Sequence, residues 1–224
     1  NNEYEFKSDH LLICGGDGTL NKVINSLPNI RDFAISLLPC GTANDFASYM
    51  GINYNFGFET RHKEKLIDLV LVNGSYFITG GGFGLPVAIV KSNERAVLRD
   101  FFRGEIYNSL AHLRVIRGYK RINGLMAICF MNQPIIGKRF QISPSSSNHD
   151  GIAEMVSIDG KSYFNEIYQL ISMQMKNFYG KTETFRHKVL EFDREHEFMA
   201  DGEILSKDRR FEFAVIPKAL RVIC

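Results

Sequence analysis

Short apolar runs and helical spacing alternate twice near the start of the chain. Residues His10–Cys14 predict a buried strand, and Thr19–Leu27 predicts a helix because apolar side chains recur there at i, i+3, i+4 and i+7. Thr19 is the expected N-cap of that helix. The pattern repeats with a strand over Phe33–Leu38 and a helix from about Asn44 to Met50. Two strand–loop–helix units within about 50 residues predict a parallel α/β layer.

Strand-like segments dominate after about residue 65. The pair Asn73–Gly74 lies between two apolar runs, Asp68–Val72 and Ser75–Thr79, and predicts a hairpin. Helical spacing returns from about Val87 to Arg117 and again over Phe164–Met175. The other predicted strands are Leu125–Met131, Ile135–Ile142, Ile152–Ile158, Val189–Phe192, Glu197–Ala200 and Phe211–Ile216. This layout predicts a small α/β domain followed by a β-rich domain.

Composition narrows the function only by exclusion. The chain has 224 residues, 45% of them hydrophobic, and a net charge of +2, so overall charge does not predict nucleic-acid binding. No apolar run approaches the roughly 20 residues of a membrane-spanning helix. The four cysteines lie in apolar runs without metal-ligand spacing, which predicts buried, reduced thiols and a reducing compartment. The six histidines are scattered and lack the spacing of a zinc site.

The loop Gly15-Gly16-Asp17-Gly18-Thr19 is the most informative chemical signal. It joins the first predicted strand to the first predicted helix, where glycines let the backbone approach an anion and the helix N-terminus offers free N–H groups. Asp17 would repel a bare phosphate, so its presence predicts a Mg²⁺ between the two. The spacing fits neither the dinucleotide fold nor the P-loop. A tight turn in which Asp17 serves only as a cap stays open as the alternative.

A second loop repeats this arrangement. Residues 38–46 read Leu-Pro-Cys-Gly-Thr-Ala-Asn-Asp-Phe, with a glycine turn, a hydroxyl and an Asn-Asp pair at a helix start. Because the carboxyl ends of neighbouring parallel strands meet at one sheet edge, both loops are expected to converge on one ligand site. Simple helix capping by Asn44 or Asp45 is the alternative for this loop.

These motifs resemble the diacylglycerol kinase catalytic family, which includes bacterial lipid kinases of the YegS and diacylglycerol kinase types. The resemblance continues to the end of the chain, in the family's order, and the run GTANDFAS after Cys40 leans toward the YegS type. The further matching segments are Asp68-Leu69, Gly80–Gly84, Asp150–Ile152, Asp201-Gly202-Glu203 and Pro217–Arg221. The resemblance implies an NAD kinase-like α/β nucleotide-binding domain, a β-sandwich-like lipid kinase domain and an active site in the cleft between them.

The family pattern also implies domain limits and an activity. Residues 1–72 would form the nucleotide-binding domain, to which residues 217–224 return, and residues 73–216 would form the lipid domain. The implied reaction moves the γ-phosphoryl group of ATP, with Mg²⁺, to the hydroxyl of a lipid such as diacylglycerol or phosphatidylglycerol. Phosphoryl transfer needs positioning and charge neutralisation, and an alcohol acceptor needs a base.

Roles for single residues follow from the same resemblance. Glu203 matches the general base, and Asp17, Asp45 and Asp68 match the carboxylates that organise catalytic Mg²⁺. Asp150, with the main-chain carbonyls of Ser147 and Ile152, matches the ligands of a separate structural Mg²⁺. The implied nucleotide-binding residues are Gly15, Gly16, Asp17, Gly18, Thr19, Leu20, Asn21 and Lys22 in the first loop, and Gly41, Thr42 and Asn44 in the second.

A basic amphipathic stretch is the candidate for membrane contact. Arg95, Arg99 and Arg103 share one helical face at i, i+4 and i+8, and further basic residues follow up to Arg121. The expectation is a protein of the cytoplasm that binds peripherally to the inner face of the membrane, without a transmembrane segment. An ordinary solvated helix face is the alternative reading. Because kinases of this type can be dimers, the resemblance also allows a homodimer.

The start of the chain raises an alternative. Family members carry roughly sixty residues before the first glycine loop, but only fourteen precede Gly15 here, so the first strands and some contacts to ATP are expected to be missing. A truncated or non-catalytic module that binds nucleotide or lipid therefore stays open. An NAD kinase-like enzyme is a third reading, because NAD kinases share a related glycine loop.

Overall fold

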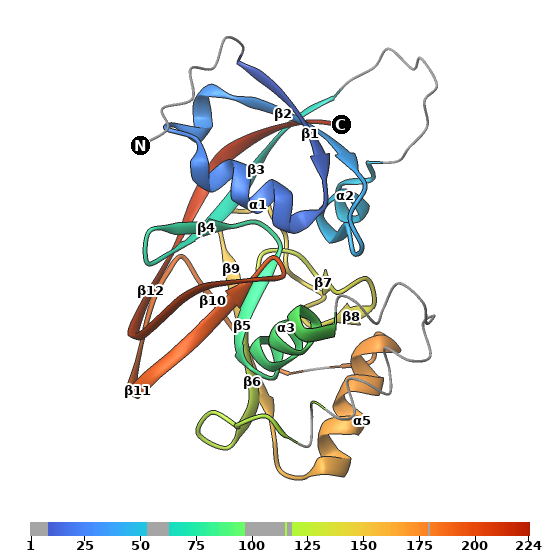
Figure 1. Cartoon of the computed structure of the whole chain (residues 1–224), viewed down its shortest axis with the longest axis vertical. Coiled ribbons are helices and arrows are strands. Elements are labelled where there is room, and N and C mark those ends of the chain that lie inside the picture. Colours follow the sequence, from blue (N-terminus) through green and yellow to red (C-terminus); the bar gives the residue numbers. More distant parts are fainter. Residues whose placement is uncertain (1–8, 53–62, 97–114, 116–117, 179) are drawn as a thin grey trace.

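A computed structural model describes residues 9–52, 63–96, 115, 118–178 and 180–224. One ten-stranded mixed sheet runs through the molecule, and a separate two-stranded ribbon lies beside it (Figure 1). The neighbouring strands of the main sheet follow the order β1-β2-β12-β11-β5-β6-β9-β10, with β3 paired to β12 and to β4. The predicted combination of an α/β part and a β-rich part is confirmed.

The α/β part contains the first two strands and the first two helices. Strand β1 (His10–Gly15) pairs in parallel with β2 (Ala34–Pro39), and the last residues of β12 (Glu203–Ile223) pair in parallel with β2. Helix α1 (Asp17–Ser26) follows β1, a 3₁₀ turn η1 (Ile30–Asp32) precedes β2, and helix α2 (Asp45–Met50) follows it. Both helices therefore begin at the carboxyl end of a parallel strand.

Helix α1 begins earlier than predicted. Gly16 is the N-cap and Asp17 is the first helical residue, whereas Thr19 was the expected N-cap. The side chain of Thr19 instead lies against Gly15, where an added Cβ would approach within 2.5 Å of the Thr19 Cβ. The pattern of apolar positions did not reveal this earlier start because the extra first turn consists of Asp17 and Gly18, which carry no apolar signal.

Strand β3 (Glu64–Val72) is buried on both faces from Ile67 onward, whereas its first three residues are exposed. It joins β4 (Ser75–Phe77) through Asn73 and Gly74, whose φ angles of 46° and 87° belong to the predicted two-residue hairpin. Successive side chains of a strand point to opposite faces. Ile67 and Leu69 accordingly pack in one core, and Val70 and Val72 pack in another.

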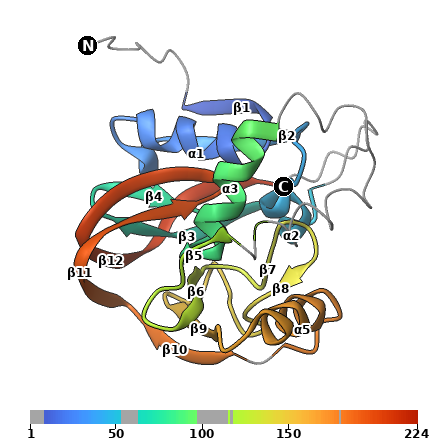
Figure 2. The ribbon, with the colours of Figure 1, turned by 60° about the horizontal axis from the view of Figure 1, so that its bottom comes forward.

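The β-rich part is built from the remaining elements. Strand β5 (Gly80–Gly84) leads into helix α3 (Leu85–Ala96), and β6 (Leu125–Met131) pairs with β5 and with β9 (Ala153–Asp159). Strands β7 (Ile135–Ile136) and β8 (Phe140–Gln141) form the separate ribbon. Helix α5 (Tyr163–Gln174) follows β9, and β10 (Lys181–Phe185), β11 (His187–Ala200) and β12 complete the chain (Figure 2).

This part of the sheet curls back on itself around a core of phenylalanines. In the strand order, β11 and β5 separate β12 from β6, yet the rings of Phe130 on β6 and Phe213 on β12 stack at 3.8 Å. Phe83, Phe198 and Phe211 surround them. Aromatic pairs of this kind stabilise a core beyond their buried area, by about 0.5–1.5 kcal/mol each. The curl gives this part the two-layered packing of a sandwich.

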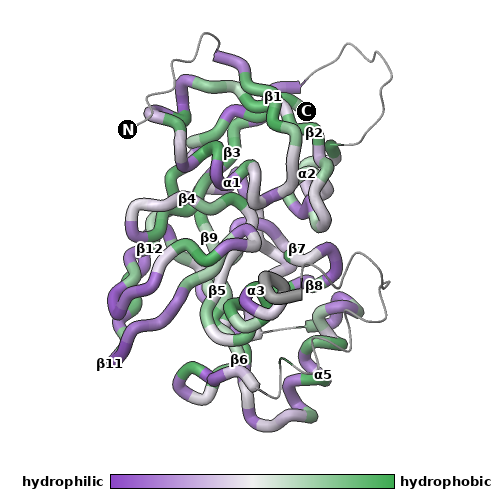
Figure 3. The backbone as a smooth tube through the Cα atoms, viewed as in Figure 1, coloured by the Kyte–Doolittle hydropathy of each residue, from purple (hydrophilic) through white to green (hydrophobic). Residues whose placement is uncertain are grey.

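The structure joins two of the predicted strands into one and divides another into two. The segments Val189–Phe192 and Glu197–Ala200 are parts of the single strand β11, which stays extended through a register shift between Glu191 and His196. The outer ends of β11 and β12 are hydrophilic, so apolar alternation underestimates their length (Figure 3). The segment Ile135–Ile142 contains β7 and β8, joined by a turn in which Gly137 and Lys138 have positive φ angles.

Strands β5 and β10 were not predicted. The sequence of β5 is Gly-Gly-Gly-Phe-Gly and has no alternation to read. A Cβ on Gly81 would lie 2.5 Å from the carbonyl oxygen of Met199, so the glycines allow close approach of backbone and neighbouring strands. Strand β10 is mostly polar and exposed, with only Phe185 buried.

Cys14 and Cys40 are exposed, which corrects the expectation of buried thiols. Cys14 alternates with the buried Ile13 along β1 and faces outward. Cys129 is buried, and burial raises its thiol pKa to about 12.

Within the described residues, no helix is long and apolar enough to cross a membrane. The predicted helical spacing from Val87 to Arg117 begins with α3, but its continuation through residues 97–114 lies outside the described residues. Arg99 and Arg103 of the basic stretch fall in that range, and the side chain of Arg95 is also outside the description.

Candidate active site

The two glycine loops lie against each other, backbone to backbone. A Cβ on Gly41 would come within 2.4 Å of the Gly16 Cα, and a Cβ on Gly16 within 2.9 Å of the Gly41 Cα. The N–H of Cys40 also donates to the carbonyl of Gly15 at 3.1 Å. The predicted convergence of the loops is therefore present, and it requires glycine at both contact positions.

Side chains of the second loop hold that loop in shape. Asn44 adopts the left-handed conformation at φ 53°, and its amide oxygen accepts from the N–H of Gly41 at 2.9 Å while its amide nitrogen donates to the Gly41 carbonyl at 2.8 Å. Asn44 thus closes a small turn at the start of α2. The side chain of Thr42 is exposed beside it.

Asp17 bridges the two loops. Its two carboxylate oxygens accept hydrogen bonds from the N–H groups of Asp45 at 2.9 Å and Phe46 at 3.0 Å. These N–H groups belong to the first turn of α2, and the first N–H groups of a helix have no carbonyl partner within that helix. Asp17 therefore caps α2. The sequence analysis considered Asp17 as a cap, and the helix that it caps is α2 rather than its own helix α1. A carboxylate can accept about four hydrogen bonds, so each oxygen retains a lone pair for a cation.

Asp45 makes the next link, toward the β-rich part. Its carboxylate accepts from the backbone N–H groups of Gly137 and Lys138, in the turn between β7 and β8. Burial raises the pKa of Asp45, and the nearby charges of Asp17 and Asp201 raise it further, against the lowering effect of the two backbone donors. Carboxylate oxygens such as those of Asp17 and Asp45 are the donors that a hard divalent ion such as Mg²⁺ prefers, and a cation between these two residues would relieve their repulsion.

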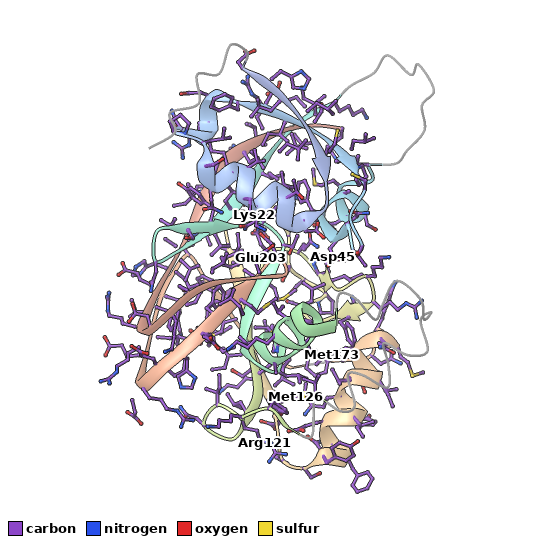
Figure 4. The ribbon with its side chains drawn as sticks, in the orientation of Figure 1. Lys22, Asp45, Arg121, Met126, Met173 and Glu203 are labelled. Carbon is purple, nitrogen blue, oxygen red and sulfur yellow. The ribbon has the colours of Figure 1, made fainter. Side chains whose placement is uncertain are left out.

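Glu203 lies over the first turn of α1. Its carboxylate pairs with the ammonium group of Lys22 at 2.8 Å, and a Cβ on Gly18 would lie 3.3 Å from the Glu203 Oε1 (Figure 4). Both partners of the ion pair are partly exposed, with side-chain exposures of 68% for Lys22 and 41% for Glu203. The predicted base and the predicted phosphate-binding stretch therefore meet directly, although they are far apart in the sequence.

The backbone N–H groups in the first turn of α1 are candidates for binding a ligand. Its N-cap is Gly16, which has no side chain to cap the helix. Uncapped N–H groups at a helix start bind anions, and the helix dipole adds to the attraction. Two residues of the predicted nucleotide-binding stretch do not face this side: Leu20 is fully buried, and Asn21 is buried at 3% exposure.

Asp201 is a positioning residue to which the sequence analysis assigned no role, although its segment is one of those that resemble the family pattern. It lies at φ 49° in the β11–β12 turn, next to Gly202, two residues before Glu203. Its buried carboxylate accepts from the Thr79 N–H and hydroxyl, from the Ile78 N–H, and from the side-chain amide of Asn21 at 2.7 Å. Burial raises its pKa against these hydrogen bonds. This network fixes the hairpin that carries Glu203 onto α1.

Asp68 joins a different set of backbone segments. It is buried at 1% exposure on β3, and its carboxylate accepts from the N–H groups of Gly151 at 2.7 Å and Lys218 at 2.8 Å. Lys218 has a φ of 52° in the irregular stretch of β12. The structure gives no contact between Asp68 and Asp17, Asp45 or Glu203 among the described residues. Asp68 therefore connects β3, β12 and the Asp150 loop.

The residues predicted to hold a structural ion lie in that same loop. Asp150 is exposed, and its carboxylate accepts from the Ile152 N–H at 3.1 Å. Nearby, Glu154 is buried against the Ser146 hydroxyl, and burial and the Asp150 charge raise its pKa. No group of three or more acidic, histidine or cysteine side chains with metal-binding geometry occurs in the described residues. The predicted ion site has only one such side chain, Asp150, together with the main-chain carbonyls of Ser147 and Ile152. The absence of a larger group therefore does not test this prediction.

Known proteins with similar sequences carry the names of lipid kinases. Residues 2–70 match the family described as "Diacylglycerol kinase catalytic domain". The chain is 29% identical over 241 residues to a "Probable lipid kinase YegS-like" of Shewanella frigidimarina, covering 95% of this chain and 75% of that protein. It is 27% identical over 241 residues to a "Diacylglycerol kinase" of Bacillus subtilis, covering 94% of this chain and 78% of the relative.

A solved structure has the same fold. The crystal structure of a diacylglycerol kinase from Bacillus anthracis matches with a TM-score of 0.71 at 18% identity, over 96% of this chain and 78% of the other. The sequence matches extend through both the α/β and the β-rich parts. Residues 2–70 therefore resemble the diacylglycerol kinase catalytic domain, and the chain as a whole is similar to proteins named as lipid kinases.

Proposed function

We propose that this protein is a lipid kinase that transfers the γ-phosphoryl group of ATP to the hydroxyl of a diacylglycerol-like or phosphatidylglycerol-like lipid. The observation that carries the proposal is the position of Glu203. The β11–β12 hairpin brings its carboxylate to the first turn of α1, beside Gly18 and Lys22. A base and a phosphate-binding helix start must adjoin if a hydroxyl is to attack a bound phosphoryl group.

The nucleotide side of the site is assigned to the two glycine loops. The uncapped N–H groups at the start of α1 would donate to phosphate oxygens, and Lys22 would add a positive charge. Asp17 and Asp45 would hold Mg²⁺ through lone pairs that their backbone hydrogen bonds leave free. When bound, Mg²⁺ supplies neutralisation of phosphate charge. The role of Asp68 toward catalytic Mg²⁺, which the resemblance implies, stays a prediction. Its carboxylate accepts hydrogen bonds from the N–H groups of Gly151 and Lys218.

The acceptor side is assigned to Glu203. The oxygen of the lipid hydroxyl forms a bond to the γ-phosphorus while the bond from that phosphorus to the β–γ bridging oxygen breaks, and ADP leaves. The hydroxyl proton passes to the Glu203 carboxylate. The ammonium group of Lys22 lies beside this carboxylate, where it would also be within reach of a bound phosphate.

The role of Glu203 is tested by Glu203→Gln, which keeps the shape and removes the base. The variant should lose at least about a hundredfold in transfer rate, because general base catalysis contributes at least that much, while ATP affinity is retained. ATP binding is measured by calorimetry and transfer by labelled phosphate in mixed micelles. The matched control is Glu183→Gln, at an exposed glutamate paired with Lys188 on β10 and β11. Normal turnover by Glu203→Gln would exclude this role.

A further inference from the structure

Helix α5 has a fixed inner face. Ile167, Leu170 and Met173 pack in the core beneath it, together with Tyr163. Glu166 also points inward, and its Oε1 accepts from the Tyr119 hydroxyl at 2.6 Å and from the Arg121 Nε at 2.7 Å. Figures 1 and 2 place the helix at the end of the molecule opposite to β1 and β2. These contacts set which side of α5 faces outward.

The outer face of α5 is a stripe of large apolar side chains. Their exposures are 81% for Phe164, 69% for Tyr168, 49% for Ile171 and 65% for Met175, at the C-cap. The positions are i, i+4, i+7 and i+11, so the four side chains lie in one line along the helix. They form four of the seven large apolar side chains that are strongly exposed among the described residues. Such a concentration on one helix marks a contact surface rather than scattered exposure.

The charges around the stripe are positive at both ends. Glu166 is the only acidic residue of α5, and it is fully buried. Lys161 precedes the helix with its side chain 79% exposed, and Lys176 follows it in an exposed position. Asp159 lies 3.8 Å from Lys161 and offsets part of that charge. An apolar stripe between cations, on a helix that itself carries no exposed acid, complements an anionic surface with an apolar interior.

We propose that α5 is an interfacial helix that docks the protein on an anionic lipid bilayer. The twelve-residue helix, about 18 Å long, would lie in the plane of the surface with its stripe buried roughly 5–10 Å into the headgroup boundary. The inference rests in part on the proposed function, since a lipid acceptor resides in a membrane. It assigns membrane contact to α5, a different segment from the basic stretch that includes Arg95, Arg99 and Arg103.

The absence of tryptophan from the chain allows a direct test. Tyr168→Trp places a single indole in the stripe, and Leu12→Trp places one at an exposed position on β1, 67% exposed, at the other end of the molecule. With vesicles of phosphatidylcholine and phosphatidylglycerol, the emission of Tyr168→Trp should shift to the blue and that of Leu12→Trp should not. No shift for Tyr168→Trp, or an equal shift for both variants, overturns the proposal.

A second measurement uses the double variant Phe164→Ala with Tyr168→Ala. Both side chains are outside the core, and alanine favours the helix, so the fold should be retained and is checked by thermal unfolding. Sedimentation with the same vesicles should show at least about tenfold weaker binding, because two large apolar side chains no longer enter the interface. The control Leu12→Ala should bind like the parent protein. Unchanged binding of the double variant contradicts the proposal.

Two further outcomes separate the inference from its alternatives. A blue shift of Tyr168→Trp that grows with protein concentration without vesicles would show that a second copy of the chain covers the stripe, and would overturn the bilayer assignment. A double variant that phosphorylates short-chain, dispersed diacylglycerol normally but fails on vesicles supports both proposals. If no variant or parent protein transfers phosphate, yet the vesicle results hold, the kinase proposal fails and the docking role of α5 stands.

Discussion

At the scale of single residues, the acidic side chains of the site hold the fold together at the positions where chemistry is expected. Asp17 caps α2, Asp45 binds the β7–β8 turn, and Asp201 fixes the hairpin that carries Glu203. Carboxylates that accept backbone hydrogen bonds are oriented before any ligand arrives, which lowers the cost of assembling a cation site. Because these hydrogen bonds also stabilise the fold, substitutions of these residues are expected to affect stability as well as activity.

The raised pKa of Asp45 predicts a pH dependence. Because the folded protein binds this proton more readily than the unfolded chain, Asp45 stabilises the fold most below its ordinary pKa of about 3.9, and this contribution is lost as pH rises through the folded value. A proton on Asp45 also competes with Mg²⁺. The acid limb of the transfer rate should therefore lie above the ordinary pKa of an aspartate and move to lower pH as Mg²⁺ concentration rises.

Rate–pH profiles at low and high Mg²⁺ measure this effect. Asp45→Asn should lose most activity, and its residual rate should show no such Mg²⁺-dependent shift. Asp159→Asn, at the exposed last residue of β9, is the matched control and should keep the parent profile. If the acid limb of the parent protein stays at the same pH when the Mg²⁺ concentration is changed, Asp45 is not a ligand of the cation.

At the scale of elements, the site depends on two strand–loop–helix units whose loops touch. Gly16 and Gly41 are in backbone contact, and both loops end at helix starts. The contact places the two helix N-termini at one edge of the sheet, where a ligand of an open α/β sheet binds. Small changes in either loop should therefore reach the nucleotide site.

Gly41→Ala tests this contact. Its Cβ would lie 2.4 Å from the Gly16 Cα, so one loop must move, and we expect a loss of about 1–3 kcal/mol in the free energy of unfolding. ATP affinity should fall as well, because the helix starts separate. Gly118→Ala is the control, since nothing lies within 4 Å of its Cβ and its backbone has no positive φ. Chemical denaturation and calorimetry give both quantities, and parent-like values for Gly41→Ala would contradict the loop geometry.

Elements with strong periodicity could be predicted, and those set by distant contacts could not. The apolar spacing of residues 164–175 predicted α5 to within one residue at each end, and Asn73–Gly74 predicted its hairpin. Strand β5 carries no alternation because it is almost all glycine. The positioning role of Asp201 was missed because its partners, Thr79 and Asn21, are more than a hundred residues away in the sequence. The family resemblance supplied Glu203, which local pattern alone reads as a hairpin turn.

At the scale of the whole molecule, two cores share the strands β3 and β12. One core contains Leu20, Ile35 and Leu220, and the other contains Phe83, Phe130 and Phe213. The carboxylates of Asp45, Asp68 and Asp201 connect segments from these two regions by accepting hydrogen bonds from backbone N–H groups. The proposed nucleotide loops and the proposed base come from different regions, so the relative placement of the regions determines the distance between the reacting groups.

The central claim is phosphoryl transfer to a lipid hydroxyl. The most direct measurement supplies ATP labelled at the γ-phosphate, with Mg²⁺, to the protein in mixed micelles containing diacylglycerol, phosphatidylglycerol or ceramide, with NAD as a separate acceptor. The account predicts label in one lipid class, no label in NAD, and loss of the signal in Glu203→Gln. Label in NAD alone, or transfer to no acceptor by a folded protein that binds ATP, would contradict it.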